Sequence, residues 1–378
     1  MKIIPSIDDT LLFYTFWVFA FFVLFQTVYV ILFFGRLAFR KQQKSTGIVP
    51  PVSIIIAARN EADNLFENIP KIMDQLYDAA FEVIVVNHQS VDDSKHLLNA
   101  LQREYANLIV VDVEKNKHLL PSKKLPLTLG IKRSTYEHLL LTDADCAPTS
   151  IHWLAEMASQ FTDKKALVLG YGPYKTIPGF LNKVIRFDTT MIAVHYFSMA
   201  INRTPYMGVG RNLAYTKTLF NEVGGFKSHY SLTSGDDDLF VQEAGTKDNV
   251  AIQLNPKSFI YSDAKTTWED FVLQKARHYS TSVKYKFFKK GMLGIYPLST
   301  LLLLVSFVIL LTQSGWWIHA LAGFGFVLLL KWWLLGVCFN RLKSRSFILA
   351  LPLLDLIYVL ISPFFYYSTL QKNTSKWK

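Results

Sequence analysis

The sequence predicts an α/β domain with a mostly parallel, doubly wound sheet, joined to transmembrane helices at both ends of the chain. Between residues 50 and 270, short β-rich runs alternate with helical stretches, which favours parallel strands joined by crossover helices. Hydrophobic residues make up 51% of the 378 residues, and this excess gathers near the two ends of the chain. Such long apolar runs are typical of lipid-facing segments rather than of a very large core.

The net charge of +11 indicates a membrane surface rather than a nucleic acid as partner. The basic residues cluster beside the apolar runs, at 36–44 and 284–290, where cytoplasmic membrane flanks carry them. We therefore expect a membrane partner and no nucleic-acid partner. The two cysteines, Cys146 and Cys338, fall in a soluble and an apolar region, which argues against a disulfide framework and favours a reducing compartment.

The first transmembrane helix is predicted over residues 11–34 and, with its basic flank, makes up an N-terminal part that covers 1–40. A signal peptide is the alternative. The run is longer than a signal-peptide core, however, and it follows Asp8 and Asp9 rather than a basic start. The positive-inside rule then places the N-terminus outside and residue 40 onward in the cytoplasm.

The soluble domain is predicted to cover residues 50–270, with Pro50-Pro51 at its entry. We expect helices on both faces of its sheet, because parallel strands need crossover connections that pass over a face. The strand-like runs stand at 52–58, 82–87, 108–113, 138–142 and 166–171.

The C-terminal region, residues 293–378, is predicted to hold two or three membrane helices. Apolar runs at 295–313 and 316–338 form a hairpin, and a third run follows at 347–369. A full third crossing would place the basic tail outside, against the positive-inside rule, so the number of crossings stays open. The third run contains Pro352, Asp355 and Pro363, which favours a kinked or partly interfacial segment. The basic, aromatic segment 271–292 is expected to lie along the membrane surface.

Asp143 and Asp145 follow the apolar run 138–142, at a strand end where α/β sheets place ligand sites. If a turn brings the two carboxylates together, they can hold Mn²⁺ or Mg²⁺, which prefer oxygen ligands and leave coordination positions for phosphate. Such a cation neutralises the charge that develops on a diphosphate leaving group. The alternative is a turn in which Asp145 caps a helix that begins near Thr149.

An ordered series of short motifs surrounds this acidic pair. In chain order they are Arg59-Asn60-Glu61, Asn87-His88 through Ser94, Ser122-Lys123-Lys124, Gly208-Val209-Gly210-Arg211-Asn212, Val223-Gly224-Gly225-Phe226 and Gly235-Asp236-Asp237-Asp238-Leu239. Over roughly residues 50–280, this series resembles the family-2 glycosyltransferases, which have a GT-A fold and use nucleotide-sugar donors.

The resemblance implies a donor site on these motifs, with Asp143 and Asp145 at the metal. The family usually places an Asp against the nucleobase after the second strand; here Asn87 and His88 stand at the matching positions, which leaves the base open. An ordinary loop residue is the alternative for His88. The implied donor-binding residues are Arg59, Asn60, Glu61, His88, Lys123, Lys124, Asp143, Gly210, Asn212, Gln274 and Arg277.

Lys123 and Lys124 match a basic loop of the family, where a lysine meets the diphosphate as a point charge, with a solvated basic turn as the alternative for either one. Gly208 and Gly210 permit a close backbone approach to the sugar or the acceptor, with a plain hairpin turn as the alternative. Processive members of the family carry Gln-x-x-Arg-Trp. This chain has Gln274-x-x-Arg277-His278, so Arg277 is expected at the diphosphate, while processive synthesis stays open.

Asp236 is the general base that the resemblance implies, with Asp237 as the second candidate. The family carries its base in a Glu-Asp-x-Asp/Glu-Leu segment, and alignment on Leu239 places it at Asp236, at a predicted helix start. An acceptor hydroxyl needs such a base because it is a poor nucleophile until its proton is taken. Neighbouring like charges raise a carboxyl pKa toward a useful value. A solvated acidic loop is the alternative.

Together these features predict an inverting, metal-dependent glycosyltransferase of the bacterial inner membrane, with a cytoplasmic catalytic domain and a lipid or envelope-glycan acceptor. A nucleotidyl- or phosphosugar transferase is one alternative, but it would carry a glycine-rich loop after the first strand, where this chain has Ala57-Ala58-Arg59-Asn60. A catalytically inactive GT-A binding protein is the other. The retained Asp143, Asp145 and Asp236 argue against it.

Overall fold

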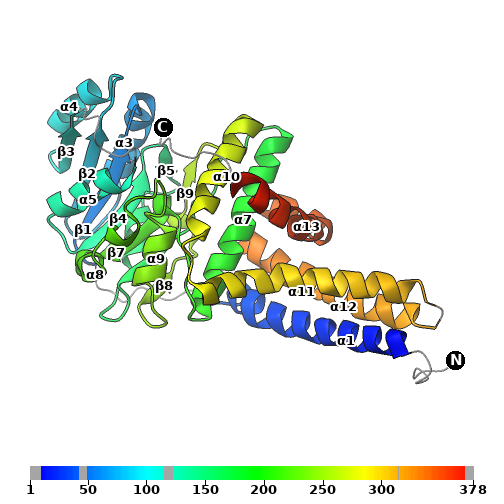
Figure 1. The fold of residues 1–378 in the computed structure, drawn as a ribbon. Helices are drawn as coiled ribbons and strands as arrows, with labels where there is room; N and C mark the ends of the chain where they lie inside the picture. The colour runs from blue at the N-terminus through cyan, green and yellow to red at the C-terminus, as the bar shows by residue number, and fades with distance from the viewer. Residues whose placement is uncertain (1–9, 42–48, 115–121, 314, 371–378) are drawn as a thin grey trace. The chain divides into compact units, whose positions relative to one another are not determined.

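The structure, a computed structural model, describes residues 10–41, 49–114, 122–313 and 315–370 (Figure 1). The chain forms two compact units, one of residues 41–285 and one of residues 1–40 with 286–368. The acidic start at Asp8 and Asp9, the basic residue Lys44 and the basic tail from Lys372 to Lys378 lie outside the described residues.

The unit of residues 41–285 is built on a seven-stranded mixed sheet in the order β3-β2-β1-β4-β7-β6-β8. The first four of these run parallel, whereas β7 pairs antiparallel with both β4 and β6. Strands β5 and β9 form a separate antiparallel pair. The strands are β1 (Val52–Ala58), β2 (Phe81–His88), β3 (Leu108–Val113), β4 (His138–Asp143), β5 (Cys146–Pro148), β6 (Leu167–Leu169), β7 (Leu213–Thr216), β8 (Val250–Ile252) and β9 (Ile260–Ser262).

The predicted fold class is confirmed, and all five predicted strands are present within a residue or two of their expected bounds, except that β6 is shorter. The sequence did not indicate β5, β7, β8 or β9, each only three or four residues long. The helices of this unit are α3 (Ala62–Met73), α4 (Ser94–Glu104), α5 (Lys124–Arg133), α6 (Trp153–Ala158), α7 (Phe180–Ile201), α8 (Lys217–Glu222), α9 (Asp238–Ala244) and α10 (Trp268–Ser282).

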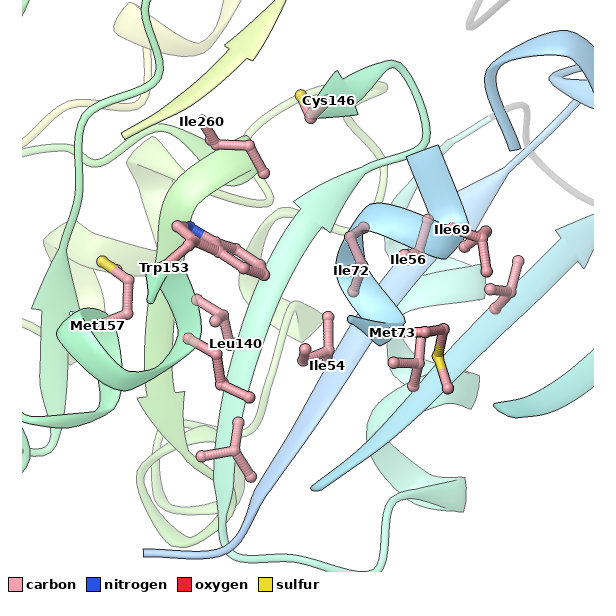
Figure 2. Packing of buried hydrophobic residues seen from close by; sticks show 14 of the residues in the cluster. Ile54, Ile56, Ile69, Ile72, Met73, Leu140, Cys146, Trp153, Met157 and Ile260 are labelled. Carbon is pink, nitrogen blue, oxygen red and sulfur yellow. The ribbon is translucent and has the colours of Figure 1, made fainter. Parts of the chain in front are cut away.

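One face of the sheet packs on α3, α4 and α6. Alternate residues of β1, among them Ile54 and Ile56, lie in one buried cluster with Ile69 of α3 and Trp153 of α6 (Figure 2). Burial of these side chains supplies most of the free energy that holds the layers together, since each large aliphatic or aromatic side chain contributes about 1.5–3 kcal/mol.

The opposite face of the sheet packs on α5 through a glycine. A Cβ on Gly130 would lie 2.7 Å from Cγ2 of Ile55 and 3.2 Å from Cγ2 of Val86. The helix therefore approaches the strands closely, which sets its first residue, Lys124, beside the carboxyl end of the sheet. Helices thus cover both faces, as the doubly wound prediction requires.

The predicted surface segment 271–292 is not one structural element. Its first part lies in α10, where Phe271, Lys275 and Ala276 are buried within the unit 41–285. Lys275 Nζ pairs with Asp188 of α7, 2.9 Å from each carboxylate oxygen. Its last part belongs to a helix that begins at Phe287, in the other unit.

The unit of residues 1–40 and 286–368 is helical. Among the described residues, four stretches are long and apolar enough to cross a membrane: Leu12–Ala38, Phe287–Leu311, Trp317–Arg341 and Arg345–Tyr367. Three of these four stretches follow residue 286. The sequence left two or three C-terminal membrane helices open, and the structure has the larger number among the described residues. The helices are α1 (Thr10–Val30), a π-helical turn (Ile31–Gly35), α2 (Arg36–Ala38), α11 (Phe287–Leu311), α12 (Trp317–Arg341) and α13 (Leu351–Leu370).

A buried polar network joins all four of these long helices. Lys331 Nζ of α12 lies 3.3 Å from Asp355 Oδ2 of α13 and donates to Thr300 Oγ1 of α11 at 3.0 Å. Gln26 Nε2 of α1 donates to the same Thr300 Oγ1 at 2.9 Å, and Tyr296 OH donates to Asp355 Oδ1 at 2.5 Å. Asp355 is therefore an interior partner of a lysine rather than a group at a membrane surface.

Asp355→Leu is expected to destabilise this helical unit by about 3 kcal/mol, because it leaves the Lys331 ammonium buried without its carboxylate. The double variant Lys331→Met/Asp355→Leu should recover most of that loss, since no charge then stays buried. The midpoint of thermal unfolding in detergent measures both, with Leu353→Ala on the exposed side of α13 as the control. An unchanged midpoint for Asp355→Leu would contradict a stabilising pair.

Candidate functional site

The motifs that the sequence singled out meet at the carboxyl end of the parallel strands. Ala57 of β1 pairs in register with Val86 of β2 on one side and with Asp143 of β4 on the other. The three loops that follow these strands are therefore neighbours, which is the usual position of a ligand site in such sheets. They carry Arg59-Asn60-Glu61, Gln89 through Asp93, and Ala144-Asp145.

Asp143 and Asp145 converge, as the metal-site hypothesis requires. One ligand atom from each, together with the Cys146 sulfur, lies within 4.8 Å of the others. The alternative of a helix cap is wrong, because residues 146–148 form β5 and the next helix, α6, begins only at Trp153. The antiparallel pairing of β5 with β9 holds Asp145 close to the end of β4.

The donor set fits a hard divalent cation. Both carboxylates are partly accessible, and the Lys123 ammonium already contacts Asp143 Oδ1, so a positive charge is favoured at this point. Cys146 is a poor ligand: burial, with the neighbouring carboxylates, raises the pKa of its thiol well above the usual value. The thiol donates to Asp145 Oδ1 at 3.4 Å and so positions that carboxylate instead.

Lys123 links the acidic pair to the acidic triplet. Burial lowers the pKa of its ammonium, but the charges of Asp143, Asp236 and Asp237 raise it more, so that the net pKa lies above the ordinary value. Lys123 is therefore a permanent cation among carboxylates from two separate segments, a position suited to a diphosphate.

The three residues of the acidic triplet have different environments. Asp238 is buried and accepts hydrogen bonds from Thr281 Oγ1 and from Tyr285 OH at 2.7 Å, so it anchors the first turn of α9. Asp237 caps that helix: its Oδ1 accepts from the N–H of Asp238 at 2.8 Å, and its Oδ2 from the N–H of Gly210 at 2.9 Å. Burial and the charges of its two neighbours raise the pKa of Asp237 to about 7.

Asp236 is half-buried beside the backbone of Gly210. A Cβ added to Gly210 would lie 3.5 Å from Asp236 Oδ2, in van der Waals contact with the carboxylate. Gly208 lies deeper, where a Cβ would come within 2.9 Å of Leu213. The segment is thus a close backbone approach to the two acids, and it leads through the turn Gly210–Asn212 into β7. The solvated acidic loop is wrong for this triplet.

The loops after β1 and β2 are tied to each other. Asn60, at a φ of +54°, accepts from the N–H of Val91 at 2.8 Å, and its own N–H donates to Ser90 Oγ at 2.9 Å. The N–H of Ala62 donates to Asp92 Oδ2 at 3.0 Å. These contacts hold the two loops in one arrangement at the edge of the candidate site.

His88 is the last residue of β2 and is buried, so it is not an ordinary loop residue. Burial first, and then the charge of Arg59, lowers the pKa of its imidazole to about 4. His88 is therefore neutral at physiological pH. A neutral imidazole carries both a hydrogen-bond donor and an acceptor.

The sequence profile of Glycosyl transferase family 21 matches residues 15–378, nearly the whole chain. The chain belongs to this family. Glycosyltransferase AglE of Haloferax volcanii is 27% identical over 199 residues, which cover 51% of this chain and 60% of that protein. The chain thus spans somewhat less than two thirds of the relative's length.

Among solved structures, the mannosyltransferase PcManGT from Pyrobaculum calidifontis, determined with GDP-Man and Mn²⁺, superposes with a TM-score of 0.53 at 16% identity and covers 94% of both chains. This likeness supports the fold. A GT-A-type glycosyltransferase is therefore confirmed for this family-21 chain, while the narrower assignment to family 2 stays a prediction.

Two residues predicted to contact the donor have structural positions in this glycosyltransferase instead. Asn212 is fully buried: its side chain accepts from Trp153 Nε1 at 3.1 Å and donates to the carbonyls of Tyr171 and Ser258 at 2.8 and 2.9 Å. It therefore joins α6 to the segment after β6 and to the turn before β9, and its side-chain donors and acceptor are used inside the protein. We correct its role accordingly.

Lys124 is the second such residue. Its side chain is fully buried, and Nζ donates to the carbonyls of His229, Leu232 and Ser234 at 2.6–2.8 Å. All three ammonium hydrogens are used, so Lys124 holds the segment before the acidic triplet rather than a diphosphate. The same segment ends at Gly235, whose φ of +101° turns the chain toward Asp236.

If the chain transfers a sugar with Asp236 as its base, Lys124→Met is expected to lower that activity about 100-fold, because the segment 229–234 would lose its support and Asp236 its position. Burial lowers the pKa of Lys124 to about 8, against the raising effect of Asp236, Asp238, Asp237 and Glu243. Deprotonation as the pH rises through 8 removes one donor, so activity should fall on the alkaline side. Lys132→Met, exposed on the same helix, is the control. Equal activity in both variants would contradict this role.

Gln274 and Arg277 lie on α10, and Gln274 Nε2 donates to Tyr174 OH at 3.1 Å. The ring of Tyr174 in turn lies under the guanidinium of Arg211, 4.3 Å from Cζ to the centroid. Arg211 and Tyr174 were not predicted. Arg211 stands in a motif that the sequence did single out, but a motif shows neither the ring beneath the guanidinium nor its neighbours.

Proposed function

We propose that this family-21 chain moves a sugar from a nucleoside-diphosphate donor to a lipid or envelope-glycan hydroxyl, with inversion, at the cytoplasmic face of a bacterial inner membrane. The observation that carries the proposal is the meeting of Asp143, Asp145, Lys123 and Asp236 at one end of the sheet. The reaction needs three things: a pair of ligands for the metal ion, a positive charge beside the diphosphate, and a base.

In the proposed mechanism, Asp143 and Asp145 would hold Mn²⁺ or Mg²⁺, and the ion would neutralise the charge of the leaving diphosphate. Lys123 contributes a fixed positive charge on the same side. Asp236 accepts the proton of the acceptor hydroxyl as the hydroxyl oxygen attacks the anomeric carbon. The attack comes from the side opposite the leaving group, so the anomeric configuration inverts in one displacement.

Asp236 is the better base of the two candidates. Both carboxylate oxygens of Asp237 already accept backbone hydrogen bonds, from Gly210 and Asp238, which commits them to the fold. The Gly210 backbone lies against the Asp236 carboxylate. Asp237 keeps a second role, since its charge acts on Lys123.

The cytoplasmic orientation draws support from the helical unit. Arg341, at the end of α12, donates to the carbonyl of Leu37 at 2.7 Å and to that of Arg40, both at the end of the first membrane stretch. Two basic ends therefore meet at the same end of the helices. From the positive-inside rule we expect that end to face the cytoplasm. Labelling of single cysteines at 313 and 345 with an impermeant reagent in intact cells should modify only position 313.

The catalytic proposal is tested on purified chain with a panel of nucleotide sugars and Mn²⁺ or Mg²⁺, scored by release of nucleoside diphosphate. Guanosine and uridine sugars both belong in the panel, because the base stays open and the neighbour of the same fold was solved with GDP-Man. Turnover that requires a divalent cation supports the proposal. Binding of a nucleotide sugar without turnover, with every acceptor class supplied, favours the inactive binding protein.

A further inference from the structure

Arg211 is a half-buried cation whose contacts are all with neutral groups. Its guanidinium stacks on Tyr174, and Nη1 donates to Ser262 Oγ at 3.3 Å. In the part of the chain that the structure describes, no carboxylate lies within ion-pair distance of it, and Nε has no hydrogen-bond partner. An arginine carries five donors in a planar fork, so donors other than the one on Ser262 are left for a ligand.

Gly172 and Tyr174 form a site that holds this side chain, here called the seat of Arg211. A Cβ on Gly172 would lie 2.4 Å from Arg211 Nε and 2.7 Å from Cγ, so only glycine leaves room for the guanidinium stem. Tyr174, two residues on, supports the plane of the fork and is itself held by Gln274. An arginine seated in this way has already lost most of its rotamer freedom, which favours tight binding of an oxyanion.

The seat lies next to the proposed metal ligands. Ser262, which accepts from Arg211, is the register partner of Cys146 in the β5–β9 pair, and Cys146 donates to Asp145. The charges of Arg211 and Asp143 also act on each other. A guanidinium that faces a cation-binding carboxylate without pairing to it is placed to share an anion with that cation.

We infer that Arg211 binds a phosphate group of the donor, beside the metal and in addition to Lys123. This inference deepens the proposed function, on which it rests: it assigns the diphosphate a residue outside the Gln-x-x-Arg motif. A phosphate on a lipid acceptor has the same chemistry. The proximity to Asp143 and Asp145 favours the donor, because the metal and the leaving diphosphate share that position.

The test is nucleotide binding rather than turnover alone. The affinities of purified full-length chain for the nucleoside diphosphate of its preferred donor, and for the bare nucleoside, are measured with Mn²⁺ by calorimetry. Arg211→Gln should weaken diphosphate binding about 10- to 100-fold, the effect of losing charged hydrogen bonds, and leave nucleoside binding unchanged. Arg211→Lys should fall between, because it keeps the charge but not the fork.

Gly172→Ala tests the seat without changing Arg211, and it should weaken diphosphate binding in the same direction. Arg103→Gln, exposed on α4, is the matched control. Unchanged diphosphate affinity in folded Arg211→Gln overturns the inference. If Arg211→Gln does not fold, unchanged affinity in both Arg211→Lys and Gly172→Ala overturns it instead. A raised KM for the acceptor alone assigns Arg211 to an acceptor phosphate and overturns the donor assignment. A wild-type chain that binds no nucleotide refutes the proposed function itself.

Discussion

Asp143→Ala is expected to reduce sugar transfer by at least about 1,000-fold, because it removes one of the two carboxylates that we propose as cation ligands and so leaves the diphosphate charge without neutralisation. The loss should be accompanied by weaker Mn²⁺ binding, which can be followed by electron paramagnetic resonance of the free ion. Transfer is measured as donor-dependent release of nucleoside diphosphate at saturating metal.

The control for this variant is Asp163→Ala, an exposed carboxylate after α6, which should leave both readings at the wild-type level. Asp143 also pairs with Lys123, so the unfolding midpoint of Asp143→Ala is recorded alongside. A folded Asp143→Ala protein with near-normal turnover would contradict the assignment of Asp143 as a metal ligand, whatever the Mn²⁺ affinity of the variant.

Asp236→Asn is expected to reduce turnover about 100- to 10,000-fold, the usual contribution of a positioned general base. The amide has nearly the same shape but cannot take the acceptor proton. Donor affinity and Mn²⁺ binding should therefore stay close to wild type, which separates this variant from Asp143→Ala. Single-turnover measurement of nucleoside diphosphate release, with donor bound in advance, gives the chemical step directly.

Asp237→Asn is the matched comparison, since the two residues are adjacent and the substitution is the same. An amide oxygen can still accept one of the two backbone hydrogen bonds that Asp237 accepts, so we expect a smaller loss there. If Asp237→Asn loses more of the chemical step than Asp236→Asn, the base is Asp237, and our assignment of Asp236 fails.

The fold could be predicted from the sequence because the first half of the soluble domain consists largely of long parallel strands. Runs such as 52–58 are continuous in β-branched and small apolar residues and are bounded by turn residues. The second half is different. Strands β7, β8 and β9 have three or four residues each, too few for a periodicity to show, and their pairing is decided by contacts distant in sequence.

The candidate site follows the same division. Asp143, Asp145 and the acidic triplet could be located because they stand at ends of elements that the sequence reveals. Asn212 and Lys124 stand in equally good motifs, yet the structure buries both and uses their hydrogen bonds inside the protein. A motif gives the residue type and its order in the chain, but not the direction in which a side chain points. Arg211 was missed because its motif does not show that its side chain points toward the candidate site.

The β5–β9 pair has a consequence for how the protein is made. Cys146 and Ser262, which are register partners, are separated by more than one hundred residues, and Asp145 stands directly before β5. Domains generally fold from the N-terminus as the chain leaves the ribosome. A nascent chain that ends before Ile260 can therefore form most of the parallel strands, but its two proposed metal ligands, Asp143 and Asp145, lack the strand that pairs with β5. The candidate site is thus one of the last parts of this unit to be completed during synthesis.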